Sequence, residues 1–103
     1  MDMKEEWLHG LCAWASNNGN VRELWLFGSR ATGRSEPGSD VDLAVLLMPH
    51  DWAFANYVAL HMEWKEQLEA IVGRDVDFGA IGIGTELDEE VRRTGKLLWA
   101  RSC

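Results

Sequence analysis

The stretch Leu26–Val45 reads LFGSRATGRSEPGSDVDLAV, and the rest of the chain is interpreted outward from it. It begins as an apolar strand that breaks at Gly28-Ser29, passes through a turn rich in Gly, Ser and Arg, and returns to an apolar strand that carries Asp40 and Asp42. A glycine in such a turn lets backbone N–H groups approach an anion closely, and the serine adds a hydroxyl. The stretch therefore predicts an anion-binding turn beside two carboxylates.

Asp40 and Asp42 are two positions apart, so in a strand they project to the same face, roughly 6–7 Å from each other. At that separation two carboxylates repel by about 2–3 kcal/mol at an effective dielectric constant of about 20. Mg²⁺ is typically held by one or two carboxylates together with phosphate oxygens. The pair and the turn together therefore predict a site for a magnesium-bound phosphate ligand. The alternative interpretations are a solvated pair on an edge strand and, for Ser29, a helix cap.

Helical and strand-like periodicities alternate on both sides of this stretch. The order predicts an α+β (mixed α/β) fold in which a small mixed β-sheet is backed on one face by helices. The expected helices are residues 4–17, one turn at 30–33, 52–72 and 86–94. The expected strands are 21–27, 40–47 and 75–78, and 79–84 is expected to be a loop. Residues 96–100 are expected to be a last short strand or the end of a helix.

Length, charge and composition limit the classes of protein to consider. A chain of 103 residues predicts a single domain over 1–103. The net charge of −7, without a Lys/Arg-rich run, argues against nucleic acid as the main partner. The start of the chain lacks the apolar region of a signal peptide, and no apolar run approaches the roughly 20 residues that span a bilayer. Cys12 and Cys103 lack metal-ligand spacing. A soluble, cytoplasmic protein is expected.

The spacing Gly28-Ser29, ten residues, Asp40-Val41-Asp42 resembles that of the nucleotidyltransferase superfamily related to DNA polymerase beta. The short chain is similar to the minimal nucleotidyltransferase (MNT) group over essentially its full length. Asp77, in a later short strand, matches the third carboxylate of that family. The resemblance implies a nucleotidyltransferase fold and the two-metal-ion, Mg²⁺-dependent transfer of AMP from ATP to a hydroxyl.

The resemblance also implies roles for individual residues. Asp40, Asp42 and Asp77 would be catalytic and would hold the metal ions, with Asp77 also orienting or deprotonating the incoming hydroxyl. Gly28 and Ser29 would bind the β- and γ-phosphates.

Three positions leave alternatives open. Asp75 shares the alternation of Asp77 and could be the third acid instead. Many relatives carry Gly-Ser-x-Ala-Arg-Gly, whereas Thr32 stands here in the Arg position. Arg30 and Arg34 flank that gap, and Arg30 is a candidate nucleotide-binding residue, its alternative being a solvated arginine.

The chain has no further domain to recognise an acceptor, so a partner protein is expected. In the MNT group this partner resembles a HEPN-type toxin, and the implied reaction is the adenylylation of a tyrosine hydroxyl by the antitoxin. Two alternatives remain: a non-catalytic antitoxin that neutralises a partner by complex formation, and a small-molecule (aminoglycoside-like) nucleotidyltransferase. The sequence leaves a homo-oligomer open. Trp52, Phe54 and Tyr57 are expected in the core, with an exposed interface as the alternative.

Overall fold

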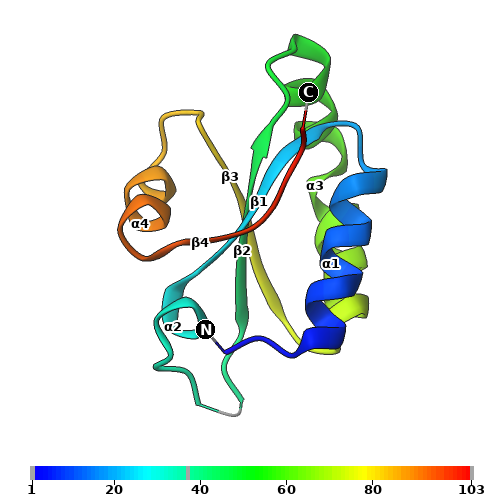
Figure 1. The fold of residues 1–103 in the computed structure, drawn as a ribbon. Helices are drawn as coiled ribbons and strands as arrows, with labels where there is room; N and C mark the ends of the chain where they lie inside the picture. Colours follow the sequence, from blue (N-terminus) through cyan, green and yellow to red (C-terminus); the bar gives the residue numbers. More distant parts are fainter. Residues whose placement is uncertain (1, 37, 103) are drawn as a thin grey trace.

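The computed structural model describes residues 2–36 and 38–102. Within them the sheet is four-stranded with the order β3-β2-β1-β4; β2 and β3 are parallel, and the other pairs are antiparallel. The predicted mixed α+β fold with a small mixed sheet is confirmed (Figure 1). The elements are α1 (Glu5–Asn17), β1 (Val21–Phe27), α2 (Gly28–Thr32), β2 (Val41–Leu47), α3 (Asp51–Val72), β3 (Val76–Ile81), α4 (Glu86–Thr94) and β4 (Lys96–Ala100).

Helices α1 and α3 lie on the same side of the sheet and cover the main core (Figure 1). Alternate residues of β2, such as Leu43 and Val45, point to this side and are fully buried. Leu11 of α1 and Leu68 of α3 meet them there. The alternation leaves Asp42 and Ala44 for the opposite side of the sheet, so the packing of the core determines which way the acid points.

Helix α4 packs against that opposite side, which adds to the expected arrangement of helices backing one face (Figure 1). Its buried Val91 contacts Phe27 and Ala44 in a small second cluster. Because α4 begins with acids and ends with Arg92 and Arg93, its charges complement its own dipole. This short helix thus covers the sheet beside Asp42.

The prediction that residues 79–84 form a loop is wrong for its first half. Strand β3 continues to Ile81, because Gly79, Ala80 and Ile81 pair in parallel with residues of β2. The absence of a side chain at Gly79 makes room for α4, since a Cβ there would lie 2.6 Å from a methyl carbon of Leu87. The turn begins only at Gly82, which has a positive φ of 82°.

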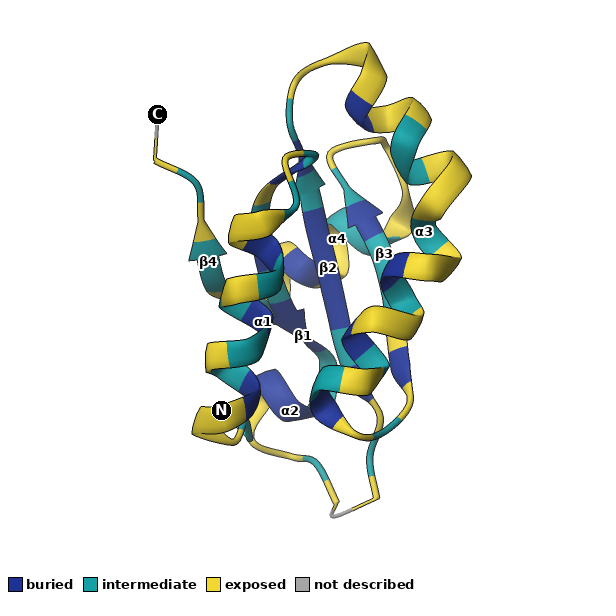
Figure 2. Ribbon diagram, turned by 90° about the vertical axis from the view of Figure 1, so that its right-hand side faces the viewer, coloured by how far each residue is buried: buried dark blue, intermediate teal, exposed yellow. Residues whose placement is uncertain are grey.

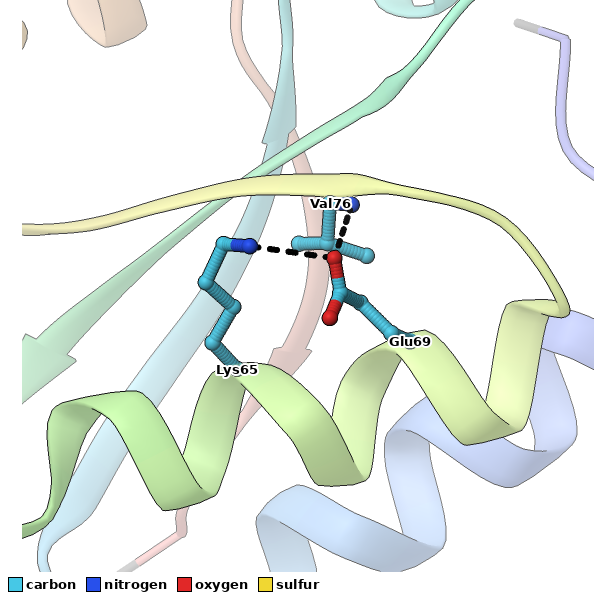
Figure 3. A network of polar contacts seen from close by, with 3 residues as sticks. All are labelled: Lys65, Glu69 and Val76. Atoms are coloured by element: carbon cyan, nitrogen blue, oxygen red, sulfur yellow. Dashed lines mark hydrogen bonds and ion pairs between the residues drawn. The ribbon is translucent and has the colours of Figure 1, made fainter.

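The junction between α3 and β3 is fixed by Glu69 (Figure 3). Its Oε2 accepts the backbone N–H of Val76 at 3.1 Å and a hydrogen bond from Lys65 Nζ at 3.0 Å. These two donors lower the pKa of Glu69, the Val76 N–H contributing most. Gly73 ends α3 in the left-handed conformation, with φ of 70°. The start of β3, and with it Asp77, is thereby held at a defined position beside β2.

No helix of the described ranges is long and apolar enough to span a membrane. Two residues considered in the sequence lie outside those ranges: Pro37, within the stretch Leu26–Val45, and Cys103.

Candidate active site

The predicted anion-binding turn and two of the three predicted acids lie on neighbouring strands. Phe27, the last residue of β1, pairs with Asp42 of β2, and Asp42 pairs with Asp77 of β3. Gly28 follows Phe27 directly and begins α2. Neighbouring strands are about 4.8 Å apart. Gly28, Asp42 and Asp77 therefore lie close together in the fold although they are far apart in the sequence.

Asp77 occupies the register position next to Asp42, whereas Asp75 precedes β3 and its carbonyl accepts the backbone N–H of Val41. Of the two acids that the sequence left open, Asp77 therefore has the placement expected of a third carboxylate. Asp40 is exposed and lies directly before β2, and Asp77 is exposed as well.

Asp42 has an unusual electrostatic environment. Partial burial raises its pKa to about 6, with further contributions from the carboxylates of Asp77, Glu90 and Asp40, while Arg30 acts in the opposite direction. The site therefore concentrates negative charge around a carboxylate that is partly removed from water, which is typical of functional carboxylates.

Gly28 is the residue whose geometry the site requires most strictly. Its φ is 72°, in the left-handed region that residues with a Cβ rarely adopt. A Cβ built at Gly28 would lie 2.1 Å from Oδ2 of Asp42. The backbone of the turn therefore approaches this carboxylate more closely than any residue with a Cβ allows. An anion bound by the turn would consequently lie next to a cation bound by Asp42.

Arg30 is placed differently from the expected phosphate contact. It is buried, and its guanidinium donates hydrogen bonds to the carbonyl oxygens of Ser39, at 2.9 and 3.3 Å, and of Asp2, at 3.2 Å. It also lies over the ring of Trp7. The guanidinium thus anchors the segment that leads into Asp40 and is neither a solvated arginine nor directed by these bonds toward a ligand.

Replacing Arg30 with alanine is expected to lower the free energy of unfolding by about 2–4 kcal/mol, because the charged hydrogen bonds of a buried guanidinium are lost. Arg34→Ala is the matched control; Arg34 is exposed, so its change should stay within about 0.5 kcal/mol. Urea unfolding without nucleotide measures both. If the two variants were equally stable and Arg30→Ala lost only affinity for ATP, the assignment of Arg30 to an anchoring role would be contradicted.

Thr32, which stands where many relatives carry Arg, directs its hydroxyl back to the carbonyls of Gly28 and Ser29, at 3.4 and 3.2 Å. It therefore supports the short helix α2 and supplies no cation.

Two residues of α4 belong to the surroundings of the site and were not singled out from the sequence. The Thr94 hydroxyl accepts the N–H of Gly28 at 3.5 Å and donates to the carbonyl of Glu90 at 3.0 Å. The carboxylate of Glu90 is close enough to raise the pKa of Asp42. Nothing in their spacing pointed to the site, because only the packing of α4 on the sheet brings them there.

The donor set suits a hard cation such as Mg²⁺ by its chemistry, since it consists of carboxylates whose mutual repulsion a cation would relieve. Across residues 2–36 and 38–102, however, no three His, Cys, Asp or Glu side chains are gathered as a bound metal would gather them. Binding would therefore require the exposed side chains of Asp40 or Asp77 to turn toward Asp42.

The fold agrees with the comparisons to known proteins. The family model described as Polymerase beta, Nucleotidyltransferase matches residues 11–103. The chain belongs to this family of nucleotidyltransferases. A comparison with curated proteins finds no match.

More particularly, the chain resembles solved structures of MNT antitoxin systems. A chain of a toxin–antitoxin complex with AMP-PNP is 24% identical, with a TM-score of 0.72, over 92% of this chain and 74% of that one. A chain of the MntA–HepT toxin–antitoxin is 22% identical, with a TM-score of 0.66, over 95% and 74%. A chain from the complex of a tri-AMPylated Shewanella oneidensis HEPN toxin with its MNT antitoxin is 22% identical, with a TM-score of 0.67, over 96% and 74%.

Proposed function

We propose that the protein is a Mg²⁺-dependent adenylyltransferase that transfers AMP from ATP to a tyrosine hydroxyl of a HEPN-type partner protein and so acts as an antitoxin in the cytoplasm. The observation that carries the proposal is the placement of Gly28, Asp42 and Asp77 side by side at the ends of three neighbouring strands. Residues 1–103 act as one nucleotidyltransferase domain in this proposal. Family membership and the AMP-PNP-bound and AMPylated complexes among similar structures support it.

In the proposed reaction, the acceptor oxygen forms a bond to the α-phosphorus of ATP while the bond from that phosphorus to the bridging oxygen breaks, releasing pyrophosphate. The N–H and hydroxyl of Ser29 bind the β- and γ-phosphates of this leaving group, and Gly28, which has no side chain, lets them approach the turn. Asp40, Asp42 and Asp77 would hold Mg²⁺, which supplies charge stabilisation for the attacking and leaving oxygens when bound. Asp77, being exposed, is accessible to the acceptor, orients its hydroxyl and takes its proton.

A second candidate function is a non-catalytic antitoxin that neutralises its partner by binding alone. Two observations favour it: Thr32 replaces the Arg of many relatives, and the guanidinium of Arg30 bonds to backbone carbonyls. Both reduce the positive charge available to a triphosphate. The acidic site would then complement a basic surface of the partner.

The two candidates are distinguished by incubating the protein with ATP, Mg²⁺ and the protein encoded beside its gene, and then measuring the partner's mass and digesting it. The proposal expects the mass of one or more AMP groups on tyrosine. An unmodified partner in a tight complex that survives Asp42→Asn would contradict it and favour binding alone. AMP found on an added aminoglycoside instead of the partner would support the small-molecule alternative.

A further inference from the structure

The outward side of α3 carries an apolar surface that no element of the described chain covers. Residues 52–62 contain no Asp, Glu, Lys or Arg. Of these residues only Ala53 is buried, so the apolar side chains extend beyond the side of the helix that faces the core. Phe54, Val58 and Met62 are 45%, 57% and 58% exposed. Figure 2 shows much of the outward side of α3 as exposed. The expectation of a core position is thus wrong for Trp52 and Phe54, which are exposed, whereas Tyr57 packs against the core as expected.

The exposed residues have the spacing that helix pairs use. Phe54, Val58 and Met62 are four residues apart and form one ridge along the helix. Ala55 and Ala59, both exposed, form the next row and leave a shallow groove beside it. A ridge next to a groove of small side chains accepts the same ridge from another helix, and rows with this spacing interdigitate at about −50°. We call these five residues the α3 face.

The α3 face is complementary to itself in the antiparallel direction. About a two-fold axis at Val58, Phe54 lies opposite Met62 of the second copy, an aromatic ring against a flexible thioether. The same axis brings Asp51, in the first turn of α3, opposite Lys65. Lys65 Nζ bonds to Glu69 in the protomer. In such a pair, Lys65 would turn from Glu69 toward Asp51 of the second copy and form one ion pair at each end of the apolar ridge.

The α3 face is also remote from the candidate active site. Asp42 points to the sheet side opposite α3 and lies at the start of β2, whereas α3 begins beyond the end of β2 (Figure 1). A partner that occupied the α3 face would not present a hydroxyl to Asp42 of the same protomer. A second copy there would leave both sites accessible.

We propose that the α3 face pairs with the α3 face of a second copy of this chain, giving a two-fold symmetric antiparallel dimer centred on Val58. Such an interface is isologous, so one residue at the axis meets itself. The inference concerns the oligomeric state and is independent of the proposed function.

Light scattering coupled to size-exclusion chromatography tests this arrangement. The native chain is expected to have the mass of a dimer at high concentration. Val58→Arg should have the mass of a monomer. Because Val58 is exposed in the protomer, this variant should melt at the temperature of the native chain at dilutions where the native chain is monomeric. Leu60→Arg is the matched control; Leu60 is 37% exposed but lies off the α3 face, so this variant should stay dimeric. A monomeric native chain, or a dimer that Val58→Arg leaves intact, would overturn the proposal.

Cysteine cross-linking tests the position of the axis. In a chain whose two native cysteines are replaced by serine, Val58→Cys should form a disulfide-linked dimer at the axis under mild oxidation, whereas Leu60→Cys in the same background should not. Equal cross-linking of the two variants would contradict the axis at Val58. The dimer would also be overturned if the native chain were a monomer and Val58→Arg abolished its binding to the HEPN-type partner protein. That result would assign the α3 face to this partner.

Discussion

Replacing Asp42 with asparagine is expected to slow AMP transfer by about 10³-fold while making the metal-free protein more stable. The loss follows because the amide removes a charged oxygen where the reaction concentrates charge. The gain follows because partial burial, and after it the carboxylates of Asp77, Glu90 and Asp40, raise the pKa of the native carboxylate to about 6. Opposite effects on activity and stability are what a residue retained for function should show.

The stability effect has a defined pH dependence. The pKa of Asp42 is about 6 in the folded protein, above the ordinary value of about 4 that it regains on unfolding. Between these values the folded state binds more protons, so native stability falls as pH rises through this range. Asparagine does not ionise, so its advantage is complete above about pH 6 and absent below about pH 4. After allowing for solvent screening at this half-exposed group, we expect about 1 kcal/mol, or about 5 °C in melting temperature.

Thermal melts of the metal-free protein at several pH values check this expectation, with Asp75→Asn as the control because Asp75 lies outside β3 and is exposed. Asp75→Asn should keep its activity. If Asp42→Asn were less stable than the native protein at alkaline pH, the electrostatic description of the site would be wrong.

Replacing Gly28 with alanine is expected to reduce AMP transfer by about 10²-fold or more. The new Cβ would lie 2.1 Å from Oδ2 of Asp42, so either the turn or the carboxylate must move. A displacement of about 1 Å at reacting groups can cost about 10²-fold in rate. The positive φ of Gly28 adds strain of about 1–2 kcal/mol.

Gly33→Ala separates the collision from the strain. Gly33 has a φ of 74°, close to that of Gly28, but a Cβ there meets nothing within 4 Å. This variant should lose about 1–2 kcal/mol of stability and keep its transfer rate. Comparing initial rates and urea midpoints of the two variants decides the point. Equal losses of activity would show that strain in α2, and not the approach of Gly28 to Asp42, explains the effect.

The sequence was sufficient for the elements whose patterns are local. Strand β1 has the predicted bounds, and α3 ends at Val72 as expected, because Gly73 stops the helix. The end of β3 was missed because Gly79 and Gly82 both suggest a turn. Only the packing of Leu87 on Gly79 distinguishes a strand glycine from a loop glycine.

Within the candidate site, the resemblance singled out Asp42 and Asp77, and the sequence left Asp75 open as the third acid. Only the register of β2 and β3 places Asp77 next to Asp42. The anchoring role of Arg30 depends on the carbonyls of Ser39 and Asp2, which no side-chain pattern reveals. Glu90 and Thr94 reach the site only through the packing of a separate helix. Long-range contacts of this kind have no local signal.

The most direct test of the central claim is the fate of the ATP phosphates. Two parallel reactions with the partner protein and Mg²⁺ would contain ATP labelled at either the α- or the γ-phosphate. The α-label is expected to appear on the partner, the γ-label is expected to leave with pyrophosphate, and Asp42→Asn is expected to slow the transfer by about 10³-fold. Transfer of the γ-label, or an unlabelled partner in both reactions, would contradict it.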